Sequence, residues 1–163
     1  MKRILITGAT SGIGRATALR LAAPDTKIII TGRRLDRLNA LSKEITAKGA
    51  ECEVLNFDVR SEHECTKHLR PLGYVDVLIN NAGTQNENDI DVNLKALIHI
   101  TEKYGVQEKI HSILSIGSAS AHTGAEFPEY CASKGGVLAY TKNVALRVAE
   151  YGATLLFDRL SLS

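Results

Sequence analysis

Residues 4–14 read ILITGATSGIG, and this stretch decides the fold. Its apolar start, residues 4–6, is typical of a short buried strand, and helical spacing begins at Ile13 and continues to residue 22. Glycines stand between the two, and glycine tolerates positive φ and lets the backbone approach a ligand closely. The start of a helix presents unpaired N–H groups, which suit a pyrophosphate. The sequence therefore predicts a phosphate cradle at Gly8, Gly12 and Gly14.

The spacing of these glycines is G-x-x-x-G-x-G, which differs from the commoner G-x-G-x-x-G fingerprint. The alternative interpretation is a glycine-rich turn that binds nothing. The strand–turn–helix context that such motifs require is present, and it favours the ligand-binding interpretation.

Strands and helices are expected to alternate along the chain, which indicates an α/β fold with a parallel sheet covered on both faces. Further strands are expected at residues 27–31, 53–57, 75–79 and 110–116, with a possible sixth at 153–157. Helices are expected at residues 91–104 and 128–151, the latter being the longest helical pattern.

The composition is that of an ordinary globular domain. The chain has 163 residues, 44% of them hydrophobic, and a net charge of +2, which gives no support for a nucleic-acid or membrane partner. Its three cysteines are an odd number without a Cys-x-x-Cys pair, which favours free thiols in a reducing compartment. The histidines lack zinc-ligand spacing. We therefore expect a cytoplasmic protein without a metal.

A second informative stretch, residues 130–134, reads YCASK. Tyr130 and Lys134 are four residues apart, so on a helix they share one face. Free tyrosine titrates near pH 10, and a nearby cation lowers that pKa. A phenol tuned in this way can donate a proton to a carbonyl or accept one from an alcohol. An ordinary surface pair is the alternative, and the phosphate cradle in the same chain argues against it.

Four motifs together resemble the short-chain dehydrogenase/reductase family. They are TGATSGIG at 7–14, NNAG at 80–83, SIGSASA at 115–121 and YCASK at 130–134. The resemblance runs from residue 1 to about residue 152. It implies a three-layer, Rossmann-type, doubly wound parallel sheet in a single domain over residues 1–163. It also implies an NAD(P)-dependent oxidoreductase that interconverts a carbonyl and a secondary alcohol.

The resemblance assigns four catalytic positions. Tyr130 would be the general acid/base, and Lys134 would stabilise its phenolate and grip the nicotinamide ribose. Ser118 would hydrogen-bond the reacting oxygen, with Ser120 as its rival in the same loop. Asn93 would hold a water that links Lys134 to solvent.

The end of the expected second strand bears on the choice of cofactor. An NAD site usually places an acid there to bond the ribose 2′-OH. This chain has Arg33 and Arg34 instead, and arginine suits a 2′-phosphate. We therefore predict NADP, with NAD as second choice; the alternative is that both arginines merely begin a helix in solvent.

The resemblance also places Asp58 at the adenine amine, with Val59 beside the ring. The full set expected to bind the cofactor is Gly8, Thr10, Ser11, Gly12, Ile13, Gly14, Arg33, Arg34, Asp58, Val59, Asn80, Ala82, Gly83, Tyr130 and Lys134.

The chain departs from the family pattern in two places. Only residues 84–92 separate Gly83 from Asn93, where the family usually has a longer insert beside the substrate. Residues 155–163 do not show the family's Pro-Gly turn, so we expect the C-terminal strand and substrate lid to be lacking. The sequence leaves open whether these shortenings are native.

Three functions compete. The first is a reductase or dehydrogenase acting on a small-molecule carbonyl or alcohol. The second is a non-catalytic dinucleotide-binding sensor or scaffold of the same fold. A sugar-nucleotide epimerase is the third, and the glycine spacing argues against it. By analogy with the family we expect a homo-oligomer, a tetramer or a dimer.

Overall fold

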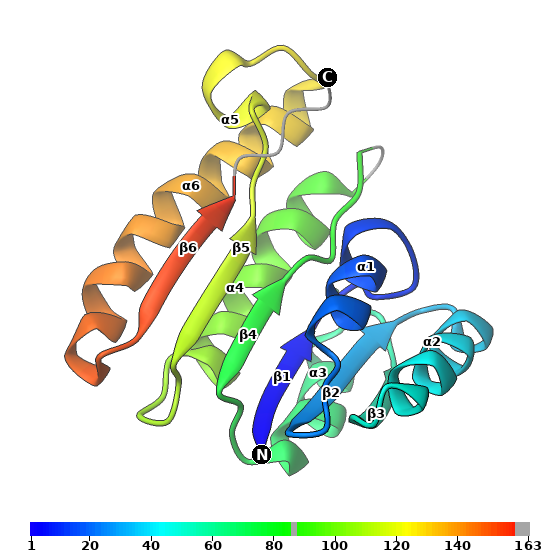
Figure 1. Ribbon diagram of the computed structural model, residues 1–163. Helices are drawn as coiled ribbons and strands as arrows, with labels where there is room; N and C mark the ends of the chain where they lie inside the picture. Colours follow the sequence, from blue (N-terminus) through cyan, green and yellow to red (C-terminus); the bar gives the residue numbers. More distant parts are fainter. Residues whose placement is uncertain (86–87, 159–163) are drawn as a thin grey trace.

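The computed structural model describes residues 1–85 and 88–158 (Figure 1). Six parallel strands form one sheet in the order β3-β2-β1-β4-β5-β6. The predicted parallel sheet is therefore confirmed, including the possible sixth strand. The strands are β1 (Lys2–Ile6), β2 (Thr26–Gly32), β3 (Glu51–Asn56), β4 (Val77–Asn80), β5 (Ser112–Ile116) and β6 (Thr154–Asp158).

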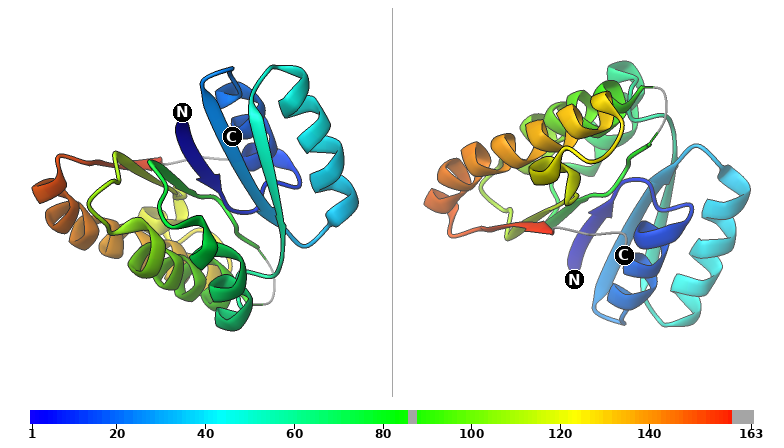
Figure 2. Two further views of the ribbon diagram at one scale, coloured as in Figure 1. Left: turned by 90° about the horizontal axis from the view of Figure 1, so that it is seen from below. Right: turned by 90° about the horizontal axis from the view of Figure 1, so that it is seen from above.

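Helices cover both faces of the sheet, as the views in Figure 2 show. Successive residues of a strand point to opposite faces, so Ile4 and Leu5 belong to different hydrophobic clusters. The cluster of Ile4 includes residues of α1 (Gly12–Leu21) and α2 (Leu35–Ala47). The cluster of Leu5 includes residues of α3 (Glu62–Leu69), α4 (Ala96–Ile100) and α6 (Pro128–Val148). These three layers confirm the Rossmann-type architecture.

Two of the predicted strands begin too early. Val75 and Ile110 are 2% and 1% exposed, yet they precede the ladders of β4 and β5. Both side chains are buried in the core at the strand entrances. Their apolar character therefore reports burial and not strand pairing.

The helix predicted at residues 91–104 is helical but not uniformly α. A π-helical turn, η2 (Ile90–Lys95), precedes α4, and a second one, η3 (Thr101–Gly105), follows it. π-Helical turns are often found at functional sites, and η2 contains Asn93. Among the described residues, no helix combines the length and apolar character needed to cross a membrane.

The strand order places the site. β1 pairs with β2 on one side and with β4 on the other, so the chain leaves these central strands toward opposite faces of the sheet. In such sheets a crevice opens beyond the carboxyl ends of the strands at this point. The glycine-rich turn after β1 and the NNAG segment after β4 meet there (Figure 1).

Candidate active site

Two adjoining cavities occupy this crevice. The first, of about 280 Å³, lies among the turn after β1 and the ends of β2 and β3. The second, of about 430 Å³, lies against the end of β5, the short helix α5 (Ser120–Thr123) and the start of α6. Both are lined by Ile13, Asn81, Gly83 and Thr84. The shared wall makes them one slot that runs from β3 to α6.

The glycines of the predicted cradle let three segments approach closely. A Cβ on Gly8, whose φ is +67°, would lie 2.6 Å from the Cα of Ala82. A Cβ on Gly14 would lie 2.5 Å from the carbonyl oxygen of Gly8 and would overlap the Asn81 amide. That amide donates hydrogen bonds to the carbonyl oxygens of Thr7 (3.1 Å) and Gly8 (2.8 Å). Gly8 and Gly14 therefore serve the packing of the β1–α1 turn against the end of β4, whereas Gly12, with a φ of +56°, has no neighbour within 4 Å of a Cβ among the described residues.

The start of α1 suits an anion. Its N-cap, Ser11, makes no side-chain cap hydrogen bond, and its first turn carries no acidic residue among the described positions. Thr10, Ser11 and Ile13, which stand at the start of α1, line the first cavity. Backbone donors at a helix start stabilise negative charge, so this wall can hold a phosphate group.

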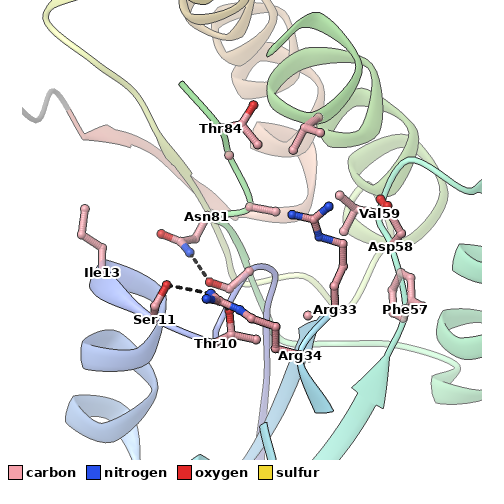
Figure 3. Close-up of a pocket in the computed structure, with 15 residues that line it drawn as sticks. Thr10, Ser11, Ile13, Arg33, Arg34, Phe57, Asp58, Val59, Asn81 and Thr84 are labelled. Carbon is pink, nitrogen blue, oxygen red and sulfur yellow. Dashed lines mark hydrogen bonds between the residues drawn. The ribbon is translucent and has the colours of Figure 1, made fainter. Parts of the chain in front are cut away.

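Both predicted arginines line the first cavity. Arg34 donates from Nη2 to the hydroxyl oxygens of Thr10 (2.5 Å) and Ser11 (3.1 Å). Figure 3 shows the Arg33 side chain extending across the cavity toward Val59. This end of the slot therefore carries the Arg33 and Arg34 guanidinium groups, with Arg34 bonded to the residues before α1.

Asp58 also lines the first cavity, but Arg60 engages it. Arg60 donates from Nη2 to Asp58 Oδ2 (2.6 Å) and from Nε to Oδ1 (3.1 Å). These hydrogen bonds hold the pKa of the Asp58 carboxyl below its usual value. Sequence analysis did not single out Arg60, although its spacing of two residues from Asp58 was visible.

At the other end of the slot, Lys134 lies beside Tyr130. The Lys134 side chain is buried, donates from Nζ to the carbonyl oxygen of Ile116 (2.9 Å) and lies 5.9 Å from the centroid of the Tyr130 ring. Burial lowers the pKa of Lys134 to about 8, and the charge of Asp89 opposes that shift. The predicted phenol–ammonium pair is thus assembled on one helix face, with both residues lining the second cavity.

The two serines that competed for one role lie together. Ser118 Oγ accepts a hydrogen bond from the backbone N–H of Ser120 (3.2 Å) and donates to Ser120 Oγ (3.2 Å). Both residues are buried and both line the second cavity. The assignment of Ser118 as the serine that binds the reacting oxygen therefore stays a prediction.

Asn93 lies behind the cavity wall and is 1% exposed. Its Oδ1 accepts from the backbone N–H of Thr84 (2.7 Å), and its Nδ2 donates to the carbonyl oxygen of Thr84 (2.9 Å) and to Ser133 Oγ (3.1 Å). Ser133 in turn donates to the carbonyl oxygen of Tyr130 (2.8 Å). Asn93 therefore joins the segment after β4 to the turn of α6 that carries the phenol.

The cavity walls include most of the predicted residues and exclude a few. The predicted residues on the walls are Gly8, Thr10, Ser11, Ile13, Arg33, Arg34, Asp58, Val59, Ala82, Gly83, Ser118, Tyr130 and Lys134. Gly12, Gly14, Asn80 and Asn93 are not among the described wall residues.

Asn80 is the clearest difference from the predicted cofactor set. It is 4% exposed, and its Nδ2 donates to Thr101 Oγ1 (2.9 Å) on the α4 side of the sheet. Its neighbour Asn81 lines both cavities instead. Phe57, Thr84 and Val92 also line the first cavity and were missing from the predicted set. Phe57 directly precedes Asp58, so adjacency was the available signal.

Comparison with known proteins agrees with this geometry. The model of the short chain dehydrogenase family matches residues 2–156. The chain is 32% identical to the 3-oxoacyl-(acyl-carrier-protein) reductase FabG of Staphylococcus epidermidis, and the match covers 94% of this chain and 72% of that protein.

Two solved structures show the same fold. A short-chain dehydrogenase from Sphingobium yanoikuyae in complex with NADPH is 26% identical with a TM-score of 0.85, and the match covers 98% of this chain and 71% of that one. An NAD+-bound xylitol dehydrogenase is 28% identical with a TM-score of 0.83, covering 98% and 69%. With the glycine cradle, the paired Tyr130 and Lys134 and the strand order, these matches show that the chain belongs to the short chain dehydrogenase family of oxidoreductases.

Proposed function

We propose that the protein is an NADP(H)-dependent oxidoreductase that interconverts a carbonyl and a secondary alcohol, with Tyr130 as general acid and base. One observation carries the proposal: a single slot has guanidinium groups at one end and the Tyr130–Lys134 pair at the other. An NADP-dependent carbonyl reduction needs groups that bind the cofactor's phosphates at one end of the site. It also needs a proton donor beside the nicotinamide at the other end. The slot offers both in that order.

The wall residues fit such a cofactor by their chemistry. The start of α1, with Thr10 and Ser11, would hold the pyrophosphate. Arg33 and Arg34 would hold a ribose 2′-phosphate. Asp58 and Val59 would contact the adenine, and Lys134 would contact the nicotinamide ribose. A bound reduced nicotinamide would supply the hydride.

The chain's own residues would then manage the proton and the oxygen. During reduction, the Tyr130 hydroxyl would donate its proton to the carbonyl oxygen, which becomes the alcohol. Ser118 would hydrogen-bond that oxygen and hold it toward Tyr130. The Lys134 ammonium would stabilise the phenolate that forms. Oxidation of the alcohol reverses each of these transfers.

The relatives leave the choice of cofactor open, since one solved neighbour carries NADPH and another NAD+. Arg33 and Arg34 support NADP here. We expect the double substitution Arg33→Ala/Arg34→Ala to weaken NADPH binding about 100-fold or more, because two charge-assisted bonds of roughly 1.5–3 kcal/mol each are lost and about 1.4 kcal/mol is tenfold. NADH binding should stay within about threefold of wild type, since NADH has no 2′-phosphate. Titration of cofactor fluorescence measures both.

The matched control is Arg37→Ala, an exposed arginine on α2 that is not among the described wall residues. It removes one positive charge from the same region. Equal losses of NADPH and NADH binding in the double variant, or an Arg37→Ala loss of the same size, would show that the arginines do not read the phosphate.

The proposed function is tested by NADPH binding and NADPH oxidation measured on the same protein across a panel of carbonyl compounds. Binding with turnover of a carbonyl supports the enzyme. Binding without turnover across the panel supports the sensor or scaffold, and failure to bind either dinucleotide contradicts both. The expected homo-oligomer and cytoplasmic location stay predictions.

A further inference from the structure

A buried carboxylate lies close to the proton-transfer end of the site. Asp89 immediately precedes η2 and is 0% exposed. Thr84 donates from its hydroxyl to Asp89 Oδ1 (2.8 Å). Asp89 belongs to the short connection between Gly83 and Asn93. A buried charge is costly unless its surroundings compensate it, and the Thr84 hydroxyl is one group that does so.

The hydrogen bonds of Asp89 lead to the catalytic turn of α6. Asp89 holds the side chain of Thr84, and both backbone polar groups of Thr84 are bonded to the Asn93 amide. Asn93 then reaches Ser133, which is bonded to the carbonyl oxygen of Tyr130. The network therefore runs without interruption from the carboxylate to the helical turn that carries the phenol.

Asp89 also acts on Lys134 through its charge. Burial disfavours the Lys134 ammonium, and the negative charge of Asp89 favours it. Other charged or titratable groups on the described elements packed against α6, or on its first turn, are Asp91 and Lys95 on η2, His122 on α5, Glu126 before α6, Glu129, Tyr130 and Cys131 on α6, Glu150 and Tyr151 on the 3₁₀ turn η4 (Ala149–Tyr151), and Asp158 on β6.

The nearest of these by sequence are exposed. Asp91 and Lys95 form an ion pair with each other (3.0 Å), and their side chains are 50% and 70% exposed. Water and salt screen such groups strongly, whereas a buried charge keeps most of its field. Asp89 therefore differs from its neighbours by its position inside the protein.

We propose that Asp89 is a positioning residue for the proposed reaction. It fixes Thr84, and through it Asn93, against the turn of α6 that carries Tyr130, and it places a buried negative charge in the network that reaches this turn. This inference rests on the proposed function for its role in turnover. Its electrostatic part can be tested without turnover.

The direct test is the titration of Lys134 by NMR of protein labelled with 15N-lysine, with the signal assigned by its loss in Lys134→Arg. The variant Asp89→Asn keeps the shape and an acceptor for the Thr84 hydroxyl but removes the charge. Because a lost negative charge disfavours the ammonium, we expect the Lys134 titration to move to lower pH by about half a unit or more. The matched control Asp91→Asn removes the same charge two residues away, from an exposed side chain.

A Lys134 titration that stays in place in Asp89→Asn overturns the electrostatic part of the proposal. So does an equal movement in Asp91→Asn, because the effect would then be one of net charge. Neither result depends on a substrate, so an inactive protein with the expected titration would contradict the proposed function and leave only the electrostatic part of this inference standing.

The positioning part is tested at Thr84. Thr84→Val removes the hydroxyl that binds Asp89 and keeps the side-chain shape and the carboxylate. We expect kcat of Thr84→Val to fall about tenfold, in keeping with the cost of a misplaced catalytic group. Thr84→Ser keeps the hydroxyl, so its kcat should stay close to that of wild type. The alkaline limb of carbonyl reduction should move to lower pH in Asp89→Asn. Wild-type kcat in Thr84→Val, or no recovery in Thr84→Ser, overturns the positioning role even if Asp89→Asn fails to fold.

Discussion

Replacement of Tyr130 by phenylalanine is expected to lower kcat by about 10²- to 10⁴-fold, the usual contribution of a general acid or base. The ring lines the second cavity beside Lys134, and phenylalanine keeps that ring and removes the hydroxyl. Since Tyr130 is half-buried and its ring is retained, cofactor binding should change by less than about threefold. Steady-state NADPH oxidation and a cofactor-binding titration on the same preparation measure the two effects.

The chain offers a matched control on the same helix. Tyr140 also lies on α6, but its hydroxyl donates to Glu102 Oε1 (2.6 Å) on η3. Tyr140→Phe removes an identical group away from the slot, so its kcat should stay close to wild type. If Tyr130→Phe keeps wild-type kcat, or if both variants lose activity equally, Tyr130 does not transfer the proton.

Substitution of Gly8 by alanine is expected to cost about 3 kcal/mol of folding free energy and to abolish tight cofactor binding. The positive φ of Gly8 accounts for roughly 1–2 kcal/mol of this, and overpacking for roughly 1–3 kcal/mol. The new Cβ would lie 2.6 Å from the Cα of Ala82, a backbone atom that cannot rotate away. Relief would have to come from moving the β1–α1 turn away from the end of β4. Urea denaturation with a cofactor titration measures both losses.

Gly152→Ala separates the two causes. Gly152 has a φ of +71° in the left-handed region, but a Cβ there would meet nothing within 4 Å among the described residues. Its substitution should therefore cost about 1–2 kcal/mol, from backbone conformation alone, with cofactor binding unchanged. A cost at Gly8 no larger than the cost at Gly152 would show that close packing of the cradle is not needed.

The parts of the site that could be predicted from sequence depend on local spacing. The cradle follows from a strand, a glycine-rich turn and a helix in succession, and Tyr130 and Lys134 meet because four residues span one helical turn. The buried apolar runs also located the strands, with errors where burial and pairing differ, as at Val75. Each of these signals lies within a few residues of chain.

The parts that were missed depend on the direction of a side chain or on distant contacts. Asn80 lies two residues after Leu78 in β4, so both face the α4 side of the sheet, where Thr101 binds Asn80. Strand alternation was therefore a usable signal for Asn80. The bonds that Asn93 makes to Thr84 and Ser133 follow from how the segment after β4 packs on α6, and no local pattern encodes them.

The meeting of β1 and β4 gives a bound dinucleotide a mechanical role besides its chemical one. Among the residues that the structure describes, the first three strands and the last three are joined in the sheet only by the β1–β4 ladder. Beyond that ladder, Thr7 Oγ1 accepts the N–H groups of Asn81 (3.1 Å) and Ala82 (3.0 Å). A coenzyme lying across this seam would tie the two halves of the molecule together, so saturation with it should raise the melting temperature and slow amide exchange most strongly along β1 and β4.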